Sequence, residues 1–218
     1  MDNLIRFPLS PEKVRDDKRA QIARPYLDRL FAHFALNGNF QWYDGDHEIT
    51  KRVQLAGADL SLVCRYTHAL RYAEVKTDFH MPYNFCLETI SNTRSQPQVP
   101  GWMVTAKADR LVTSFVWLEG VLDVFVNPFQ DLQAWFWRGK NYQQFRKYTV
   151  PNSTNNTESR IVPITTIINN VETTRYLITH DGQIFSVPLA GQDTIDVVRR
   201  VLDKKGYPFK KLADEKAS

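Results

Sequence analysis

The stretch Ala58-Asp59-Leu60-Ser61-Leu62-Val63-Cys64, followed after a short gap by Tyr72-Ala73-Glu74-Val75-Lys76, decides the fold of this chain. Both runs have the apolar and β-branched character of strands, and the gap between them suits a hairpin. Because side chains alternate along a strand, Glu74 and Lys76 share one face. With a four-residue loop, Asp59 lies opposite Lys76 on that face, whereas a three-residue loop turns Asp59 to the other face.

Two carboxylates and an ammonium at one end of a sheet suit a divalent metal ion and a phosphodiester. Magnesium prefers hard oxygen ligands, usually one or two carboxylates together with water and substrate phosphate. We expect Asp59 and Glu74 to bind Mg²⁺ (or Mn²⁺), with the backbone carbonyl of Val75 as a third ligand. Lys76 would neutralise charge at the scissile phosphate or orient the attacking water. An exposed, charged strand face would give the same pattern without any activity.

The composition indicates a single globular domain. The chain has 218 residues, of which 43% are hydrophobic, and a formal net charge of +4. This length fits one domain, with residues 1–150 forming the core with N-terminal helices and residues 151–218 adding strands and a helix. The mild basicity favours a polyanionic partner without requiring one.

No membrane segment is visible in the sequence. No apolar run approaches the ~20 residues that cross a bilayer, so no membrane partner is expected. The N-terminal residues lack the apolar segment of a secretory signal, and we expect a cytoplasmic protein.

The periodicity of the chain predicts an α+β fold, with a central mixed sheet flanked by helices. Helices are expected over residues 10–37, broken at Pro25, and over 127–139 and 194–205. A polar segment over residues 151–158 is expected to be a loop. Strands are expected near residues 40–43, 59–65, 69–77, 84–91, 111–118, 121–126, 161–168 and 175–187, with hairpin turns at Glu119-Gly120 and Asp181-Gly182.

Two other chemistries lack their sequence signals. The five histidines, at positions 33, 47, 68, 80 and 180, do not show the spacing of zinc ligands. No glycine-rich phosphate-binding loop is present, so nucleotide hydrolysis has no support.

The order of the motifs resembles that of the PD-(D/E)xK nuclease superfamily, particularly its small phage and mobile-element members. The resemblance covers roughly residues 50–126. It implies a restriction-endonuclease-like core with a divalent-metal site. The segments that carry it are Gln54-Leu-Ala-Gly57-Ala-Asp59, Glu74-Val-Lys76-Thr-Asp78, Asn84-Phe-Cys-Leu-Glu88, Pro100-Gly101-Trp102 and Ala108-Asp109.

Positions in this chain correspond to the functional residues of that superfamily. Asp59 matches its lone acid, and Glu74 and Lys76 match its Glu-x-Lys motif. Glu88 matches the extra catalytic acid that some members place on the following strand, and an exposed strand acid is the alternative. The sequence departs from the named motif at Ala58, where the motif has proline.

Several neighbouring residues have alternative roles. Gln54 is a candidate for contacting DNA or the water, or is a plain surface amide. Asp78 competes for the metal or ends its strand, and we favour the second role. Asp44 or Asp46 takes the place of Asp59 if the strand register differs. Trp102 and Asp109 are expected to pack and anchor the core.

A stretch from Trp135 to Tyr148 interleaves basic and aromatic residues. Cations neutralise phosphates and aromatic faces stack on unpaired bases, so this stretch is a candidate nucleic-acid surface. The alternative is an amphipathic helix whose aromatic rings fill the core while its cations face water. In either case the cations can contact a DNA backbone. They are Arg138, Lys140, Arg146 and Lys147.

The sequence therefore predicts a divalent-metal-dependent DNA endonuclease that nicks or cuts its substrate. One alternative is a catalytically inactive module that binds DNA or protein on a nuclease fold. Another is a ribonuclease that uses the same chemistry. A monomer and a homodimer both stay open.

Overall fold

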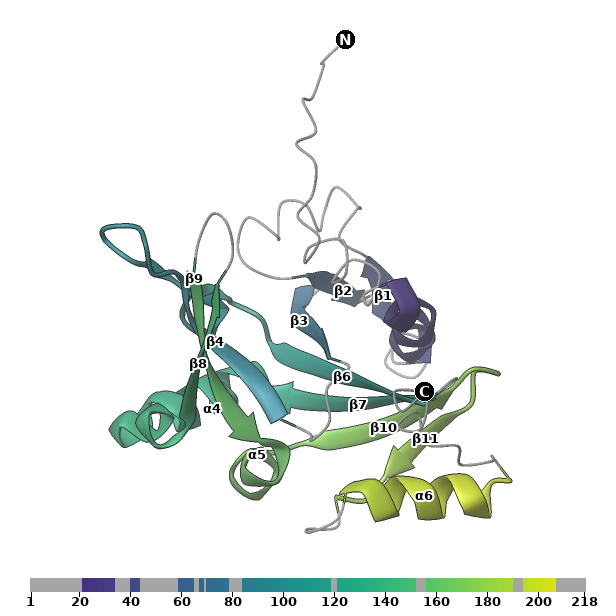
Figure 1. Ribbon diagram of the computed structural model, residues 1–218. Coiled ribbons are helices and arrows are strands. Elements are labelled where there is room, and N and C mark those ends of the chain that lie inside the picture. Colours follow the sequence, from purple (N-terminus) through teal and green to yellow (C-terminus); the bar gives the residue numbers. More distant parts are fainter. Residues whose placement is uncertain are drawn as a thin grey trace.

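The computed structural model describes residues 21–33, 40–43, 59–64, 67–68, 70–78, 84–118, 121–151, 156–189 and 194–206. Within these residues the main sheet has seven strands in the order β1-β2-β3-β6-β7-β10-β11 (Figure 1). Strands β3 and β6 are parallel, and the other neighbours are antiparallel, so the sheet is mixed. The strands are β1 (Phe40–Tyr43), β2 (Leu60–Cys64), β3 (Leu70–Asp78), β6 (Arg110–Leu118), β7 (Val121–Pro128), β10 (Thr174–Thr179) and β11 (Ile184–Val187).

A second sheet combines strands from the connection between β3 and β6 with the later strands β8 and β9. Parallel neighbours need a long crossover, and here the crossover carries two strands and a short helix. In the described part of the chain this sheet has four strands in the order β5-β4-β9-β8. The elements are β4 (Asn84–Asn92), β5 (Val99–Pro100), α3 (Trp102–Thr105), β8 (Arg146–Pro151) and β9 (Asn156–Pro163).

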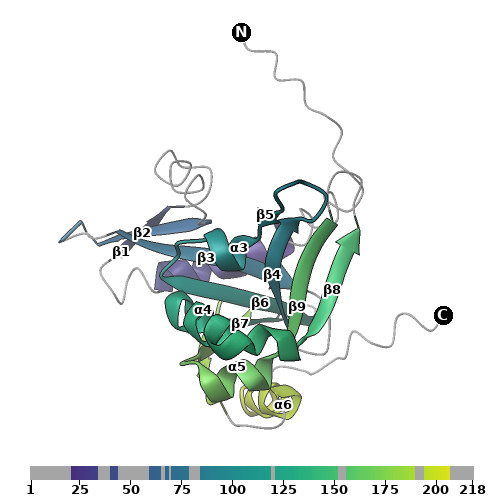
Figure 2. The ribbon, with the colours of Figure 1, turned by 90° about the vertical axis from the view of Figure 1, so that its left-hand side faces the viewer.

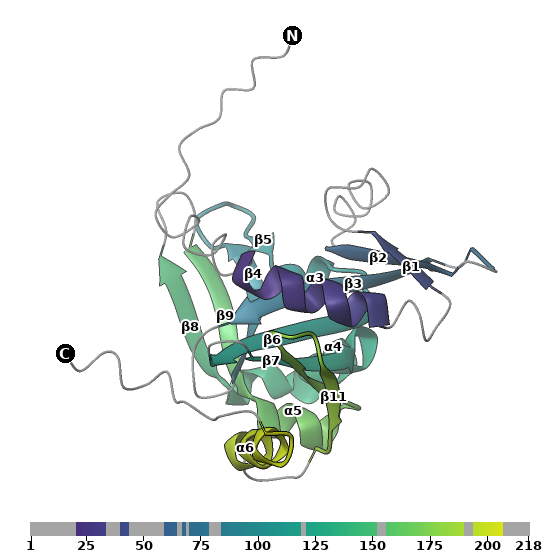
Figure 3. The same ribbon diagram turned by 90° about the vertical axis from the view of Figure 1, so that its right-hand side faces the viewer.

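Helices cover both faces of the main sheet. The helix over residues 21–33, purple in Figure 3, lies against one face. The second sheet and three further helices pack against the other face. These helices are α4 (Phe129–Trp137), α5 (Ile164–Asn170) and α6 (Thr194–Lys204), and a 3₁₀ segment, Arg138–Gln144, follows α4. The predicted α+β class, a central mixed sheet flanked by helices, is confirmed.

The core explains how the second sheet is fixed on the first. The side chains of β7 alternate between two buried faces, as expected for a strand covered on both sides. Phe125 of β7 contacts Phe115 of β6 and Phe85 of β4, with ring centroids 5.9 and 6.3 Å apart. These aromatic contacts join the two sheets and set the position of β4 relative to β3.

The register of β2 and β3 differs from the expected one by two residues. The observed pairs run from Leu60–Ala73 to Val63–Leu70. Continued by one residue, this register puts Asp59 opposite Glu74 instead of Lys76, because the connection is longer than the four-residue loop of the prediction. A shift of two residues preserves the face on which a side chain lies, so Asp59 remains on the face of Glu74 and Lys76.

Other local predictions are corrected by the structure. The helix over residues 21–33 continues through Pro25. Its buried face includes Leu27, Leu30 and Phe31, and burial of such side chains at about 1.5–3 kcal/mol each outweighs the cost of a proline, about 3 kcal/mol. The helix expected over residues 127–139 ends at Trp137.

The segment around residue 160 also differs from its prediction. Residues 156–158 of the expected loop begin strand β9, because they pair with β8 and, at Glu158, with β4. The strand expected over residues 161–168 ends at Pro163, and Ile164–Asn170 is helical. Since β9 pairs with β4 and β10 pairs with β7, segments on both sides of residue 150 build the same sheets. No helix in the described residues is long and apolar enough to cross a membrane.

Candidate functional site

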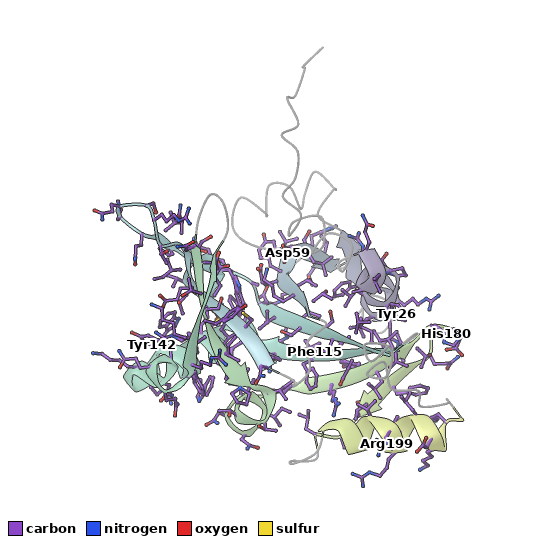
Figure 4. All side chains as sticks on the ribbon, in the orientation of Figure 1. Tyr26, Asp59, Phe115, Tyr142, His180 and Arg199 are labelled. Atoms are coloured by element: carbon purple, nitrogen blue, oxygen red, sulfur yellow. The ribbon has the colours of Figure 1, made fainter. Side chains whose placement is uncertain are left out.

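Asp59 lies immediately before β2 and is fixed to β3 by two hydrogen bonds. Its backbone N–H donates to the carbonyl of Ala73 at 3.0 Å, and its carboxylate accepts the N–H of Val75 at 2.9 Å. The side chain remains 43% exposed. Figure 4 labels Asp59 near β2 and β3, well apart from Tyr142, which follows α4, and Arg199 on α6. The strand pairing therefore holds a solvent-accessible carboxylate in a defined place.

Glu74 and Lys76 bring the other charges of the predicted site to Asp59. The Nζ of Lys76 lies 2.5 Å from Oε1 of Glu74 and 3.7 Å from Oδ2 of Asp59. The Glu74 side chain is only 5% exposed, whereas that of Lys76 is 39% exposed. One ammonium therefore lies between two carboxylates, because alternation along β3 puts Glu74 on its face and the register of β2 puts Asp59 there too.

Burial and charge shift the pKa values of this cluster. Burial raises the pKa of the Glu74 carboxyl, and the attraction of Lys76 opposes this rise without cancelling it, while the Asp59 carboxylate adds to it. Desolvation opposes the charge on Lys76, but Asp59 and Glu74 outweigh it and raise the pKa of the ammonium above its ordinary value. Lys76 is therefore a permanent cation at neutral pH.

Glu88 joins the cluster from the second sheet. Its half-buried side chain on β4 accepts a hydrogen bond from the backbone N–H of Trp102, the first residue of α3, and another from Ser91. Burial raises the pKa of Glu88, and these bonds and the charge of Lys76 lower it by less. The charges of Glu88, Glu74 and Lys76 influence one another, so the fold gathers all four predicted catalytic side chains.

The donor atoms of this cluster fit a hard divalent cation. Among the described residues, no three carboxylate, imidazole or thiol side chains lie close enough to hold a metal ion by themselves. Magnesium needs only one or two carboxylates, since water and phosphate supply its other ligands. Asp59 and Glu74 offer two carboxylates that already converge on one positive charge, the ammonium of Lys76. This ammonium marks where a cation is favoured.

The Val75 carbonyl is placed for a third ligand. In a strand the N–H and C=O of one residue point to the same side. The N–H of Val75 bonds to Asp59 on the β2 side, so the carbonyl lies on that side too. The β2 ladder ends at Ala73, two residues before it. The carbonyl therefore lies at the edge where the Asp59 carboxylate is held.

Two residues that were expected to anchor the core do so in different ways. Asp109 accepts the backbone N–H of Tyr72 at 2.8 Å and the guanidinium of Arg71 at 3.2 Å, and so holds the start of β3. Trp102 also packs on the core, but its ring centroid lies 5.4 Å from the Nζ of Lys76. The sequence reasoning missed this second contact, although the Gly101-Trp102 pair was a signal for it.

The basic residues of the candidate nucleic-acid surface separate into two groups. Arg138, Lys140 and Arg146 are exposed. Lys147 instead forms an ion pair with the buried carboxylate of Glu158. Gln54, like the rival acids Asp44 and Asp46, lies outside the described residues, as does the side chain of Asp78.

Five of the six aromatic residues of this stretch belong to the core or pack against it, as the packing alternative predicts, whereas Tyr148 is 44% exposed. Phe136 is fully buried, and Trp137 lies against both Phe136 and Tyr142, with ring centroids 4.9 Å apart in each case. The backbone is not one helix, since α4 and the 3₁₀ segment are followed by strand β8. Those rings are therefore engaged in packing, and the exposed cations and Tyr148 remain for contact with other molecules.

Comparisons of this chain with models of protein families, with curated proteins and with solved structures find no match.

Proposed function

We propose that the protein is a divalent-metal-dependent DNA endonuclease with the PD-(D/E)xK arrangement of catalytic groups. The observation that carries the proposal is the convergence of Asp59 and Glu74 on Lys76 at one end of β2 and β3, with Glu88 beside them. A structural ion pair needs one carboxylate for one ammonium. A surplus of negative charge around a buried acid is costly for the fold, and it suits a site that receives a further cation.

Asp59 and Glu74 would hold the metal ion, Mg²⁺ or Mn²⁺, with the carbonyl of Val75. When bound, the ion supplies Lewis acidity for the phosphate and lowers the pKa of a coordinated water. Asp59 is kept in place by the Val75 N–H, so its carboxylate needs little rearrangement to act as a ligand. The Glu74 side chain is buried, and its carboxylate points toward Lys76.

Lys76 would act on the substrate rather than on the metal. Its ammonium is charged at neutral pH and 39% exposed, so it can contact a phosphate oxygen directly. In the transition state it would stabilise the additional negative charge on the phosphorus centre. Glu88 would complete the site by holding a water or the ammonium from the side of the second sheet, through its electrostatic contact with Lys76.

The exposed cations favour a nucleic acid as the substrate. Arg138, Lys140 and Arg146 lie along the 3₁₀ segment and the start of β8, and the chain as a whole carries a net charge of +4. Cations of this kind bind the phosphate backbone without reading its sequence. The restriction-endonuclease-like core is part of the same proposal, supported by the succession of an acid immediately before β2, Glu-x-Lys on β3 and a second acid on β4.

A panel of substrates and ions tests this function. The wild-type protein is incubated with supercoiled plasmid, linear duplex, single-stranded DNA and single-stranded RNA, each with Mg²⁺, Mn²⁺ or EDTA. We expect plasmid to be nicked or linearised with either metal ion and left intact with EDTA. Cleavage of RNA alone would point to a ribonuclease. Cleavage that persists in EDTA would contradict the metal-dependent mechanism.

A second candidate is a module that binds DNA or protein without cutting. The contact of Lys76 with Glu74 at 2.5 Å favours it, because the ammonium already satisfies a carboxylate that a metal would need. Isothermal titration with Mn²⁺ separates the two candidates. A nuclease site should bind Mn²⁺ and lose this binding in Glu74→Gln, whereas an inactive site should bind none.

A further inference from the structure

Trp102 lies where the two halves of the site meet. It begins α3, which Figure 2 shows between β3 and the β4–β5 pair. Asp59, Glu74 and Lys76 belong to the β2–β3 side, and Glu88 belongs to β4. Within the described residues, α3 is therefore placed to contact both groups.

The indole ring contacts the ammonium of Lys76. The Nζ lies 5.4 Å from the ring centroid, within the range of a cation–π interaction. The ring also packs on Phe129 of α4, with centroids 5.9 Å apart. The end of α3 is tied to α4 by Gln133 and Trp137, which donate to the carbonyl of Met103 at 3.1 and 3.3 Å. The ring is thus held on a rigid support.

The backbone of the same turn fixes Glu88. The N–H of Trp102 donates to the Glu88 carboxylate, and the N–H of Gly101 donates to the carbonyl of Thr89 at 2.9 Å. A Cβ on Gly101 would lie 2.6 Å from the Glu88 carbonyl oxygen and 2.8 Å from its Cγ. Only glycine allows the turn to approach Glu88 this closely.

We propose that Trp102 is a positioning residue for cleavage, holding the Lys76 ammonium with its ring and the Glu88 carboxylate with its N–H. This inference rests on the proposed nuclease function. The carboxylates that hold Lys76 in this structure are the two that would ligate the metal. Once they do so, their attraction for Lys76 is weakened, and the face of Trp102 remains as a partner that the metal does not occupy.

The test compares Trp102→Leu, Trp102→Phe and the control Trp135→Leu. The control removes an indole that packs on Phe145, away from the site. Trp102→Leu should slow single-turnover plasmid cleavage by about threefold to thirtyfold, the range that cation–π energies span. The DNA concentration for half-maximal rate and the affinity for Mn²⁺ should stay as in the wild type. Trp102→Phe should recover most of the rate, and the control should match the wild type.

A second readout does not depend on activity. In the wild type, the ε-methylene protons of Lys76 should show an upfield ring-current shift by NMR, both without metal and with Mg²⁺. Trp102→Leu should abolish this shift. If the wild type cleaves DNA and Trp102→Leu cleaves it at the same rate, the role of Trp102 is overturned, while the proposed function stands. A wild type that cuts no nucleic acid would overturn the proposed function, and the role of Trp102 with it.

Discussion

The carboxylate of Asp59 accepts a hydrogen bond from the backbone N–H of Val75, and the same oxygen, Oδ2, lies 3.7 Å from the ammonium of Lys76. This bond continues the attachment of β2 to β3 beyond the last pair of their ladder, Leu60–Ala73, to which Asp59 is adjacent in the chain. A strand end thus fixes a charged side chain without burying it.

Asp59→Asn should separate the structural role of Asp59 from its chemical role. The amide oxygen of Asn can still accept the N–H of Val75, so the melting temperature should change little. The loss of charge should weaken Mn²⁺ binding about tenfold or more, as measured by calorimetry. Unchanged Mn²⁺ affinity in this variant would remove Asp59 from the set of metal ligands.

Glu88→Gln should change how stability depends on pH. Burial raises the pKa of Glu88 above its ordinary value of 4.5, so the folded state holds the proton more tightly than the unfolded chain does. Ionisation of Glu88 therefore destabilises the fold as the pH rises through the raised pKa, and below the ordinary value this effect is absent. Gln retains acceptors for Trp102 and Ser91 without the charge.

Thermal unfolding across a pH series measures this effect. Glu88→Gln should melt above the wild type at neutral pH, and the two curves should converge in acid. A wild type that is the more stable protein at neutral pH would show that ionised Glu88 is favoured by its surroundings. That result would contradict the direction of the pKa shift.

The buried pair of Asp123 and Arg175 should dominate the stability of the main sheet. The guanidinium donates twice to the carboxylate, at 2.9 and 2.6 Å, and the side chains are 0% and 1% exposed. Asp123→Ala should lower the free energy of unfolding in urea by about 3–5 kcal/mol, because it removes the carboxylate that faces a buried guanidinium. The double variant Asp123→Leu/Arg175→Met should lose less than the sum of the single variants. Additive losses would show that the two charges are not coupled.

Arg146 and Lys147 should differ in their effects although they are neighbours. Arg146 is exposed, so Arg146→Ala should lower the slope of log K for DNA binding against log salt by about 0.9 and leave stability unchanged. Lys147→Ala removes an ion-pair partner of Glu158, whose side chain is 9% exposed and whose other ion pair among the described residues, with Arg160, is longer at 3.5 Å. It should therefore lower the melting temperature. Equal salt slopes for Arg146→Ala and the wild type would exclude a phosphate contact at Arg146.

The β2–β3 part of the site could be predicted from the sequence because strand alternation is independent of distant contacts. Glu74 and Lys76 share a face in any strand. The face of Asp59 depended on the number of residues in the connection, and the actual register differs from the expected one by an even number. The contact between Lys76 and Trp102 could not be predicted, because it follows from how the crossover packs on the main sheet.

The β-strand propensity of one segment led to a wrong prediction, because its buried residues follow the spacing of a helix and not that of a strand. The β-branched run from Ile164 to Ile168 resembles a strand, but Ile164 and Ile167 are the buried pair, at helical spacing. Strand β8 was not predicted, because its charged and polar residues show no strand pattern of their own. These residues are extended because they pair with β9. In both cases tertiary packing decided the outcome.

The single-turnover rate of plasmid cleavage, measured for the wild type, Glu74→Gln, Lys76→Ala and Arg71→Ala, tests the central claim most directly. Arg71→Ala is the matched control, because Arg71 is another cation of β3 whose partner is Asp109, away from the carboxylate pair. We predict Mg²⁺-dependent cleavage by the wild type and the control, and a loss of at least about a hundredfold in the two site variants. Cleavage by Glu74→Gln and Lys76→Ala at the rate of the wild type would contradict the account.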